Sequence, residues 1–449
     1  MKNNLHIPSA QKHLLYLVVA LLFTAQPIAA KTQQLPPWDT FVSQFIETYF
    51  KTHPDFAANA GRHEFDGKLP DWSIAGLTKE KQWLDLQHDL VSQYPESSLK
   101  ETERFERQYL LAVIDENMFW LHSAQAPFKN PMYYAHSLDP NVYISRPYAP
   151  IEQRLKAFID YAGNIPKATE QIRTNLKLPL PHTYIDVGKK VFGGFAKFYE
   201  VDVKANFANV KDEQLQKQFN TVVPIAAKAM RELADWMESQ RKTATDDYAM
   251  GTPRFQEMLK ATEGIDLSLS ALEKAGRDDL ERNLAALREA CSHYAPEPSV
   301  QDCVKKAEAK KPPEGAVAAA QRQLITLKAF ITEKKLVTIP GSEEAMVAES
   351  PPYNRWNSAY IDIPGPYEQG LPSTYYVAPP DPSWSPKEQA AYIPSKGSCG
   401  RTPKSVRSEL SLLSFSEGDC IGCWDYFLLV RSMCRTASSN VNELPASDA

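Results

Sequence analysis

Apolar side chains recur at the spacing of an amphipathic helix from residue 38 to residue 331. The first stripe consists of Trp38, Phe41, Phe45 and Tyr49. It ends at His53-Pro54, because proline disfavours helical backbone in the preceding residue. The later stripes are Leu215, Phe219, Val222, Val223, Met230, Leu233 and Met237, then Leu280, Leu284 and Leu287, then Leu324, Leu327 and Ile331. We expect these stripes to be buried, and the pattern predicts a mainly α-helical array.

Short local signals predict where individual helices start. Thr78 precedes an apolar stripe and can accept a hydrogen bond from a first-turn amide as an N-cap. Ser98 and Glu101 have the spacing of a capping box, which predicts a helix start there. Pro224 lies within a helical stripe, and we expect it to start or kink that helix.

The composition changes after Leu336, where β-prone pieces appear at residues 336–339, 360–363 and 373–377. They predict a small β-sheet in the 336–378 region. Eleven prolines lie between residues 340 and 394, interleaved with Tyr and Trp. A disordered Pro-rich linker is the alternative, but such linkers lack aromatic residues at this density. Tyr and Trp combine a flat apolar ring with one polar tip, and this composition suits a binding cleft.

The first thirty residues have the pattern of a secretory leader. Residues 14–23 form an unbroken apolar run, Lys2 and Lys12 precede it, and Ile28-Ala29-Ala30 offers a small-residue cleavage site. A membrane anchor is the alternative, but ten apolar residues span only about half of a hydrocarbon core. We therefore expect an exported protein, periplasmic or extracellular, with no membrane partner after the leader is removed. The net charge of −5 gives no reason to expect a nucleic-acid partner, and the oligomeric state stays open.

The six cysteines fall into two groups. Cys291 and Cys303 flank a short loop between two helical patterns, and in an exported protein we expect a disulfide between them. The other four, Cys399, Cys420, Cys423 and Cys434, belong to a Ser- and Cys-rich tail over residues 397–449. A zinc site or a redox pair there is the functional alternative. The interpretation we prefer is a tail that does not belong to the folded domain of residues 31–396.

Motifs that carry hydrolytic chemistry are absent from the sequence. Zinc peptidases commonly place His-Glu-x-x-His on one helix, so that two imidazoles bind zinc while Glu activates water. Among the nine histidines, only His63 is followed by Glu, and no histidine lies three or four residues beyond Glu64. The nearby Gly67 favours a turn. We find neither a nucleophile elbow nor a P-loop.

Several segments together resemble an exported family known by its domain of unknown function, DUF885. The resemblance covers about residues 38–396 and is specific in the last third of that range. The segments that carry it are His53-Pro54, Gly61-Arg62-His63-Glu64, and residues 336–340, 347–357, 359–366 and 372–377. The family resembles zinc metallopeptidases of the gluzincin type, which are mostly helical with a small sheet beside a metal cleft. The resemblance implies a peptidase-like activity and, in an intact member, a zinc cofactor.

The resemblance ends at Lys396. The family pattern continues there into a helix with a His-Glu-x-x-Pro-Gly-His motif, whereas this chain continues with Gly397-Ser398-Cys399. No catalytic residue and no metal ligand can be carried over, so no cofactor is expected in this chain. A shifted reading frame in the gene would explain the change, and a genuine exchanged tail is the competing explanation. Whether the chain is an enzyme therefore stays open.

Two functions remain after this comparison. The first is a metallopeptidase-like protein that is truncated before its His-Glu motif and is catalytically silent as written. The second is an exported helical protein that binds a peptide or another ligand in the Pro-aromatic cleft without chemistry.

Four residues are candidates for contacting a substrate or ligand. Tyr360, Tyr375 and Tyr376 belong to β-prone pieces that match the family, and they could line the cleft. Arg355 could hold a substrate carboxylate through two parallel hydrogen bonds. If the piece at residues 373–377 is an edge strand, an extended peptide could pair with it. The alternative is structural for each residue: tyrosines in a sheet core and an arginine in a buried ion pair.

Overall fold

The computed structural model describes residues 35–294, 299–308, 314–339, 344–351, 359–368 and 370–379. The predicted leader at residues 1–30, Arg355, and the tail with its four cysteines lie outside these residues. The chain divides into two compact units, Met1–Ser43 and Gln44–Ala449. In the first unit, the rings of Trp38 and Phe41 stack at the start of helix α2. All further contacts described below lie within the second unit.

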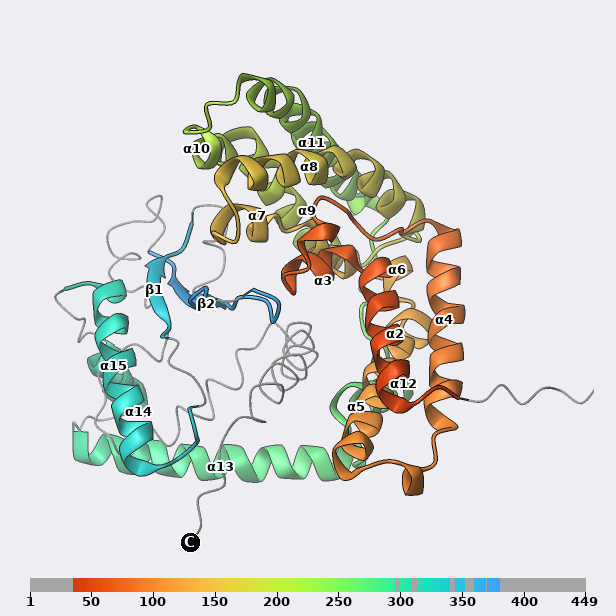
Figure 1. Ribbon diagram of the computed structural model, residues 1–449. Helices are drawn as coiled ribbons and strands as arrows, with labels where there is room; N and C mark the ends of the chain where they lie inside the picture. The colour runs from red at the N-terminus through yellow and green to blue at the C-terminus, as the bar shows by residue number, and fades with distance from the viewer. Residues whose placement is uncertain are drawn as a thin grey trace, which may run out of the picture. The chain divides into compact units, whose positions relative to one another are not determined.

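The described chain is mostly helical and contains one small three-stranded mixed sheet, as the sequence predicted (Figure 1). The α-helices are α2 (Trp38–Thr52), α3 (Pro54–Asn59), α4 (Ile74–Ser92), α5 (Glu101–Met118), α6 (Ala126–Lys129), α7 (Asn141–Ser145), α8 (Ile151–Asn175), α9 (His182–Lys197), α10 (Val203–Phe207), α11 (Glu213–Ser239), α12 (Thr252–Glu263), α13 (Leu269–Tyr294), α14 (Val300–Glu308) and α15 (Ala316–Lys334). The strands are β1 (Met346–Glu349), β2 (Ala359–Asp362) and β3 (Thr374–Val377). None of the described helices has the length and apolar character needed to cross a membrane.

The helix start predicted at Thr78 is wrong, and the one predicted at Ser98–Glu101 is right in position but not in its capping residues. Helix α4 begins four residues before Thr78, and Ser73 is its N-cap, with its Oγ accepting a hydrogen bond from Gly76 N at 3.1 Å. The Ser98–Glu101 capping box does not form. Instead, α5 begins at Glu101, and the amide of Lys100 donates to the Glu103 carboxylate at 2.8 Å. In both places an equivalent capping group a few residues away takes the role.

Helices α8, α9 and α11 pack side by side and enclose the best-buried part of the described chain. The ring of Phe158 on α8 lies 5.3 Å from Phe207 and 6.0 Å from Phe219 on α11, measured between centroids. Gly188 on α9 allows close approach, because a Cβ there would lie 2.8 Å from Met237 Cε. The stripe predicted on α11 is buried at Phe219, Val223, Met230, Leu233 and Met237. Pro224 does not start this helix, which continues through it.

The sheet has the order β1-β3-β2, with β1 parallel and β2 antiparallel to β3. Two of the predicted strand pieces correspond to β2 and β3. The third prediction, a strand at residues 336–339, is wrong, because these residues are not paired. The first strand is Met346–Glu349 instead, beside α15. Because β3 is the central strand, the expectation that it forms an open edge for peptide pairing is also wrong.

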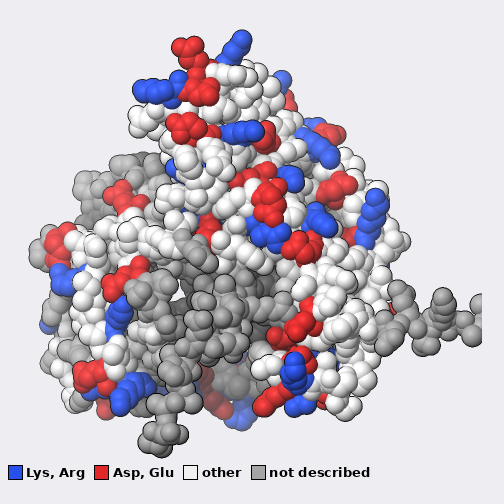
Figure 2. All heavy atoms as spheres, viewed as in Figure 1, with Lys and Arg blue, Asp and Glu red and all other residues white. Residues whose placement is uncertain are grey.

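The C-terminal helices contradict one core prediction. Leu280, Leu284 and Leu287 on α13 were expected to be buried, yet their side chains are 57%, 37% and 39% exposed. At the end of this helix, Cys291 forms a disulfide with Cys303 on α14. Figure 2 shows basic and acidic side chains interspersed over the visible face of the described residues, with no large area of one sign.

Candidate functional site

Two of the predicted ligand-contacting tyrosines meet on the sheet. Tyr360 on β2 and Tyr376 on β3 are register partners, and their rings stack with centroids 4.9 Å apart. Burial raises the pKa of Tyr376, and the nearby Asp362 carboxylate adds to this rise. Tyr376 therefore stays protonated, and the stacked pair packs one face of the sheet.

The other two predicted residues are not part of this pair. Tyr375 points to the opposite face of the sheet, because side chains alternate along a strand. Its register partners there are Val347 on β1 and Ile361 on β2, and Ile361 is 48% exposed. Arg355 lies outside the described residues. The structure thus divides the predicted tyrosines between the two faces of the sheet, and each face also carries an exposed apolar side chain, Ile361 on one and Met346 on the other.

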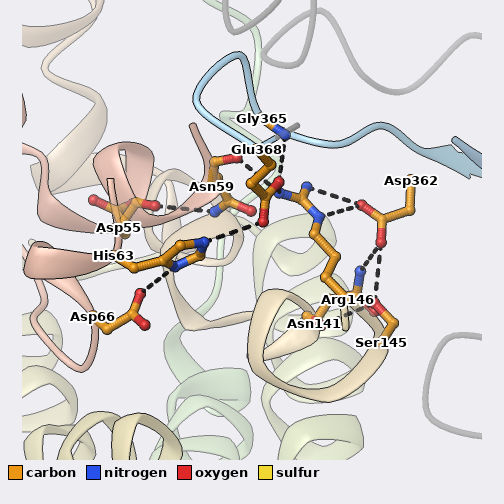
Figure 3. A network of polar contacts seen from close by, with 10 residues as sticks. All are labelled: Asp55, Asn59, His63, Asp66, Asn141, Ser145, Arg146, Asp362, Gly365 and Glu368. Atoms are coloured by element: carbon orange, nitrogen blue, oxygen red, sulfur yellow. Dashed lines mark hydrogen bonds and ion pairs between the residues drawn. The ribbon is translucent and has the colours of Figure 1, made fainter. Parts of the chain in front are cut away.

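A polar network holds the end of β2 against the helices (Figure 3). At its centre is Arg146, which follows α7 and whose side chain is 11% exposed. Its Nε and Nη2 both lie 2.9 Å from Asp362 Oδ1 at the end of β2. Its Nη1 donates to Asn59 O at 2.7 Å and to Glu368 Oε2 at 3.2 Å. One guanidinium group thus links α3, α7 and the loop between β2 and β3.

The Asp362 carboxylate accepts two more hydrogen bonds from α7. Ser145 Oγ donates to Asp362 Oδ2 at 3.0 Å, and Asn141 Nδ2 donates to the same oxygen at 3.3 Å. The Asp362 side chain is only 9% exposed. A buried carboxylate is tolerated when charge and hydrogen bonds compensate for lost hydration, and here Arg146, Ser145 and Asn141 provide both.

His63 forms the second cationic point of the network. Its Nδ1 lies 3.1 Å from Asp66 Oδ1, and its Nε2 lies 3.2 Å from Glu368 Oε1. The imidazole stacks on Tyr148 with centroids 3.6 Å apart. Burial alone would lower the pKa of His63, but the hydrogen bonds to Asp66 and Glu368 raise it to about 9. The ring is therefore an imidazolium at neutral pH, and both of its nitrogens are engaged.

Glu368 is shared between the two cations. Its side chain is 3% exposed, and burial would raise its pKa. The hydrogen bond from His63 and the charge of Arg146 outweigh this effect and keep the pKa below the ordinary value. The amide of Gly365 also donates to Glu368 Oε2, at 2.5 Å. The two cations, His63 and Arg146, are thus fully engaged with the carboxylates of Asp66, Asp362 and Glu368, which suits a rigid support better than proton transfer to a substrate.

Glycines allow the two backbones joined by this network to touch. A Cβ on Gly365 would lie 2.1 Å from the carbonyl carbon of Ala60, so no larger residue fits there. Gly61 has φ +90°, and a Cβ on it would lie 2.7 Å from Glu368 Cγ. The amide of Tyr367 donates to Ala60 O at 3.0 Å. The two sequence segments that contain Gly61 and Gly365 are therefore direct neighbours in space.

One more carboxylate borders the network. Burial raises the pKa of Asp139, the negative charge of Asp362 adds to the rise, and His136 opposes it. Asp139 Oδ1 accepts a hydrogen bond from Asn141 N at 2.9 Å. Within the described ranges, no three His, Cys, Asp or Glu side chains are grouped so that they could hold a metal ion.

The sequence analysis missed Arg146, Asp362 and Glu368 as members of a common site. Asp362 lies within the β-prone piece at residues 360–363, and a charged residue among apolar ones there is a signal for a buried partner. The partner itself could not be found, since Arg146 lies 216 residues away.

Comparison with known proteins gives one family and two solved structures. The model of the bacterial family of unknown function DUF885 matches residues 54–394. A protein from Shewanella oneidensis, described as a "putative lipoprotein of unknown function", shares 19% identity at a TM-score of 0.61, over 80% of this chain and 67% of that chain. A "putative lipoprotein" from Colwellia psychrerythraea shares 13% identity at a TM-score of 0.56, over 76% and 66%. The chain thus spans about two thirds of the length of each, and none of the curated proteins compared matches it.

Proposed function

Because the chain belongs to the DUF885 family of bacterial proteins, we propose that it is an exported relative of zinc metallopeptidases that does not hydrolyse peptide bonds in the form given by this sequence. In this proposal, residues 31–396 are the N-terminal part of a larger helical domain, and residues 397–449 are a divergent tail. The leader-like residues 1–30 support export, as do the two related structures described as putative lipoproteins.

The observation that carries this proposal is the state of the only His-Glu pair in the sequence. His63 uses both ring nitrogens for Asp66 and Glu368, so neither is available to a metal ion. Glu64 accepts a hydrogen bond from Arg62 Nε at 2.7 Å. A zinc metallopeptidase needs a bound metal ion and a free carboxylate that acts as a base, and this His-Glu pair supplies neither.

An activity assay tests the proposal directly. The mature chain is purified, its zinc content is measured by mass spectrometry, and a set of fluorogenic peptides is assayed with and without a chelator. We expect no turnover above background in either condition. Turnover that the chelator abolishes, together with stoichiometric zinc, would contradict the proposal. His63→Gln serves as a control, because activity from a contaminant is unchanged by it.

Resequencing the gene across the codons for Lys396 and Gly397 tests the truncation separately. We expect another reading frame to encode a His-Glu motif immediately downstream. If no frame does, residues 397–449 are the natural continuation and the proposed truncation is wrong.

The face of the sheet that carries Tyr375 favours a second function, which is binding of a peptide or another ligand without chemistry. Tyr375, Ile361 and Val347 form an apolar surface on that face, and 48% of Ile361 is exposed. Aromatic and aliphatic side chains of this kind contribute much of the energy of ligand contacts. In a fluorescence anisotropy assay, Tyr375→Ser should weaken binding of a labelled peptide about tenfold or more. The same change at Tyr248, which is 59% exposed and lies between α11 and α12, should not. Equal effects would contradict this function.

A further inference from the structure

Helix α13 carries an apolar surface that no described element covers. Every residue from 281 to 290 is exposed, although an ordinary surface helix of a globular protein buries about one third of its circumference. Leu280, Leu284 and Leu287 are spaced by four and three residues, which places them on one side of the helix. We call these three residues the α13 leucine stripe. Their exposure is far above that of the corresponding stripe on α11, which is buried.

The charged residues of α13 separate into two groups. Three pairs lie within the helix and satisfy one another: Glu273 with Arg277, Lys274 with Asp278, and Asp279 with Arg282. Glu281 and Arg288, like Glu289, form no ion pair with any part of the described chain. Glu281 and Arg288 are seven residues apart, or about two helical turns, so they lie on the same side of the helix. They border the leucine stripe at its two ends.

The side chains along the other border of the α13 leucine stripe are small and uncharged. Asn283, Ala286 and Ala290 lie there, and the Asn283 side chain donates to Asp279 within the helix. Small side chains let a second helix approach closely. The stripe therefore has an apolar centre, one small border, and one border with an acid and a base at opposite ends.

We propose that the α13 leucine stripe binds the same stripe of a second copy of this chain, with the two helices antiparallel. A two-fold axis near Leu284 places Leu280 of one copy opposite Leu287 of the other. The same axis places Glu281 opposite Arg288 twice, within about one residue, or about 1.5 Å along the helix. Glu281 and Arg288, which have no ion-pair partner in the described part of the chain, are thus complementary to themselves across the axis. This inference is independent of the proposed function.

The charge pattern favours a second copy over another occupant. A foreign helix would need its own base opposite Glu281 and its own acid opposite Arg288, at this spacing. A second copy has both by symmetry. It is also present wherever the protein is, at the same concentration.

Sedimentation equilibrium of the mature chain between about 1 and 100 µM tests the inference. We expect a reversible monomer–dimer equilibrium that Leu284→Glu shifts to monomer, because two glutamates would then face each other at the axis. Ile225→Glu is the matched control. It changes an equally apolar side chain that is 51% exposed on α11, and it should leave the dimer unchanged.

A charge exchange tests the orientation. Glu281→Arg alone and Arg288→Glu alone each place like charges opposite one another, and each should raise the dissociation constant about tenfold. The double variant Glu281→Arg, Arg288→Glu restores opposite charges and should recover most of the loss. A misfolding effect would not be recovered in this way. A wild-type chain that stays monomeric throughout, a control variant that dissociates equally, or a double variant without recovery would each overturn the proposal. Monomers whose stripe binds a hydrophobic dye would indicate a different occupant.

Discussion

The helices α8, α9 and α11 and the helices α13, α14 and α15 have similar apolar periodicity but very different burial. In the first group, Phe158, Phe192 and Met230 are fully buried. In the second group, the buried residues of the described chain are Cys291, Cys303, Ala319 and Ala320. The difference shows that an amphipathic pattern specifies which side of a helix seeks a partner, but not that this chain supplies the partner.

This contrast bears on which part of the molecule can do what. The first group is a packed support whose stability comes from its own core. Within the second group, the disulfide joins α13 to α14, and α15 lies beside β1. Surfaces that bind partners are more readily found in the second group, because apolar area is still exposed there.

Truncation of an aromatic side chain in the core of the first group should cause the largest loss in the free energy of unfolding. Phe158→Ala removes a ring that contacts Tyr199, Phe207 and Phe219, and we expect a loss of about 3–5 kcal/mol in the free energy of unfolding. Urea denaturation followed by circular dichroism measures it. A loss below about 1 kcal/mol would mean that the first group is not the stable core.

Breaking the network between β2 and the helices should have a slightly smaller effect. Arg146→Ala leaves Asp362 buried without its cation and Glu368 with His63 as its only cation, and we expect a loss of about 3 kcal/mol in the free energy of unfolding. Arg146→Lys keeps the charge but not the planar geometry of the guanidinium group, so it should recover only part of the lost stability. If Arg146→Ala is as stable as the wild type in the same urea experiment, the network is not a structural link.

The stability of the network should depend on pH through His63. Its folded pKa of about 9 lies above the unfolded value of about 6.5. The resulting stabilisation is fully present below pH 6.5 and is lost as the pH rises towards 9. We expect the free energy of unfolding to decrease by about 3 kcal/mol between pH 6 and pH 9.5, and His63→Gln should remove this decrease. An unchanged pH profile in His63→Gln would assign the decrease to other groups.

The smallest loss in the free energy of unfolding is expected from truncation of an exposed side chain on α13. Leu284→Ala should change the free energy of unfolding of the monomer by less than about 0.5 kcal/mol, because its side chain is already 37% exposed and has few neighbours. Measured at a concentration where the chain is monomeric, this variant is the counterpart of Phe158→Ala. Hydrogen exchange should likewise be fast in residues 281–290 and slow in α8 and α11. Slow exchange in residues 281–290 of the monomer would contradict the contrast between the two groups.

The fold class was predictable because it depends on local periodicity. The stripe on α11 is correctly identified from its spacing, and its partners α8 and α9 lie within 90 residues of it in the chain. The stripe on α13 has the same spacing, and the prediction that it is buried failed because no described element covers it. The strand predicted at residues 336–339 failed for a related reason. Its β-branched residues have strand propensity, whereas β1 forms a strand only because β3 pairs with it.

The candidate site was less predictable than the fold. Tyr360 and Tyr376 could be identified from their β-prone pieces, but their separation from Tyr375 depends on strand register. The polar network could not be predicted from the sequence, because it joins Asn59 and His63 to residues more than 300 positions later. Local patterns contain no information about such pairs.

The separation of His63 and Glu368 has a consequence for how the chain is made. The two residues are 305 positions apart, and ribosomes add about 5–20 residues per second, so His63 waits roughly 15–60 s before Glu368 is synthesised. During this time Asp66 is available to His63, but the loop that fits against Gly61 does not yet exist. The N-terminal helices are therefore synthesised well before the contact that holds them to this loop can form. The fold can be completed only late in synthesis, because the loop between β2 and β3 lies near the end of the residues that match the family.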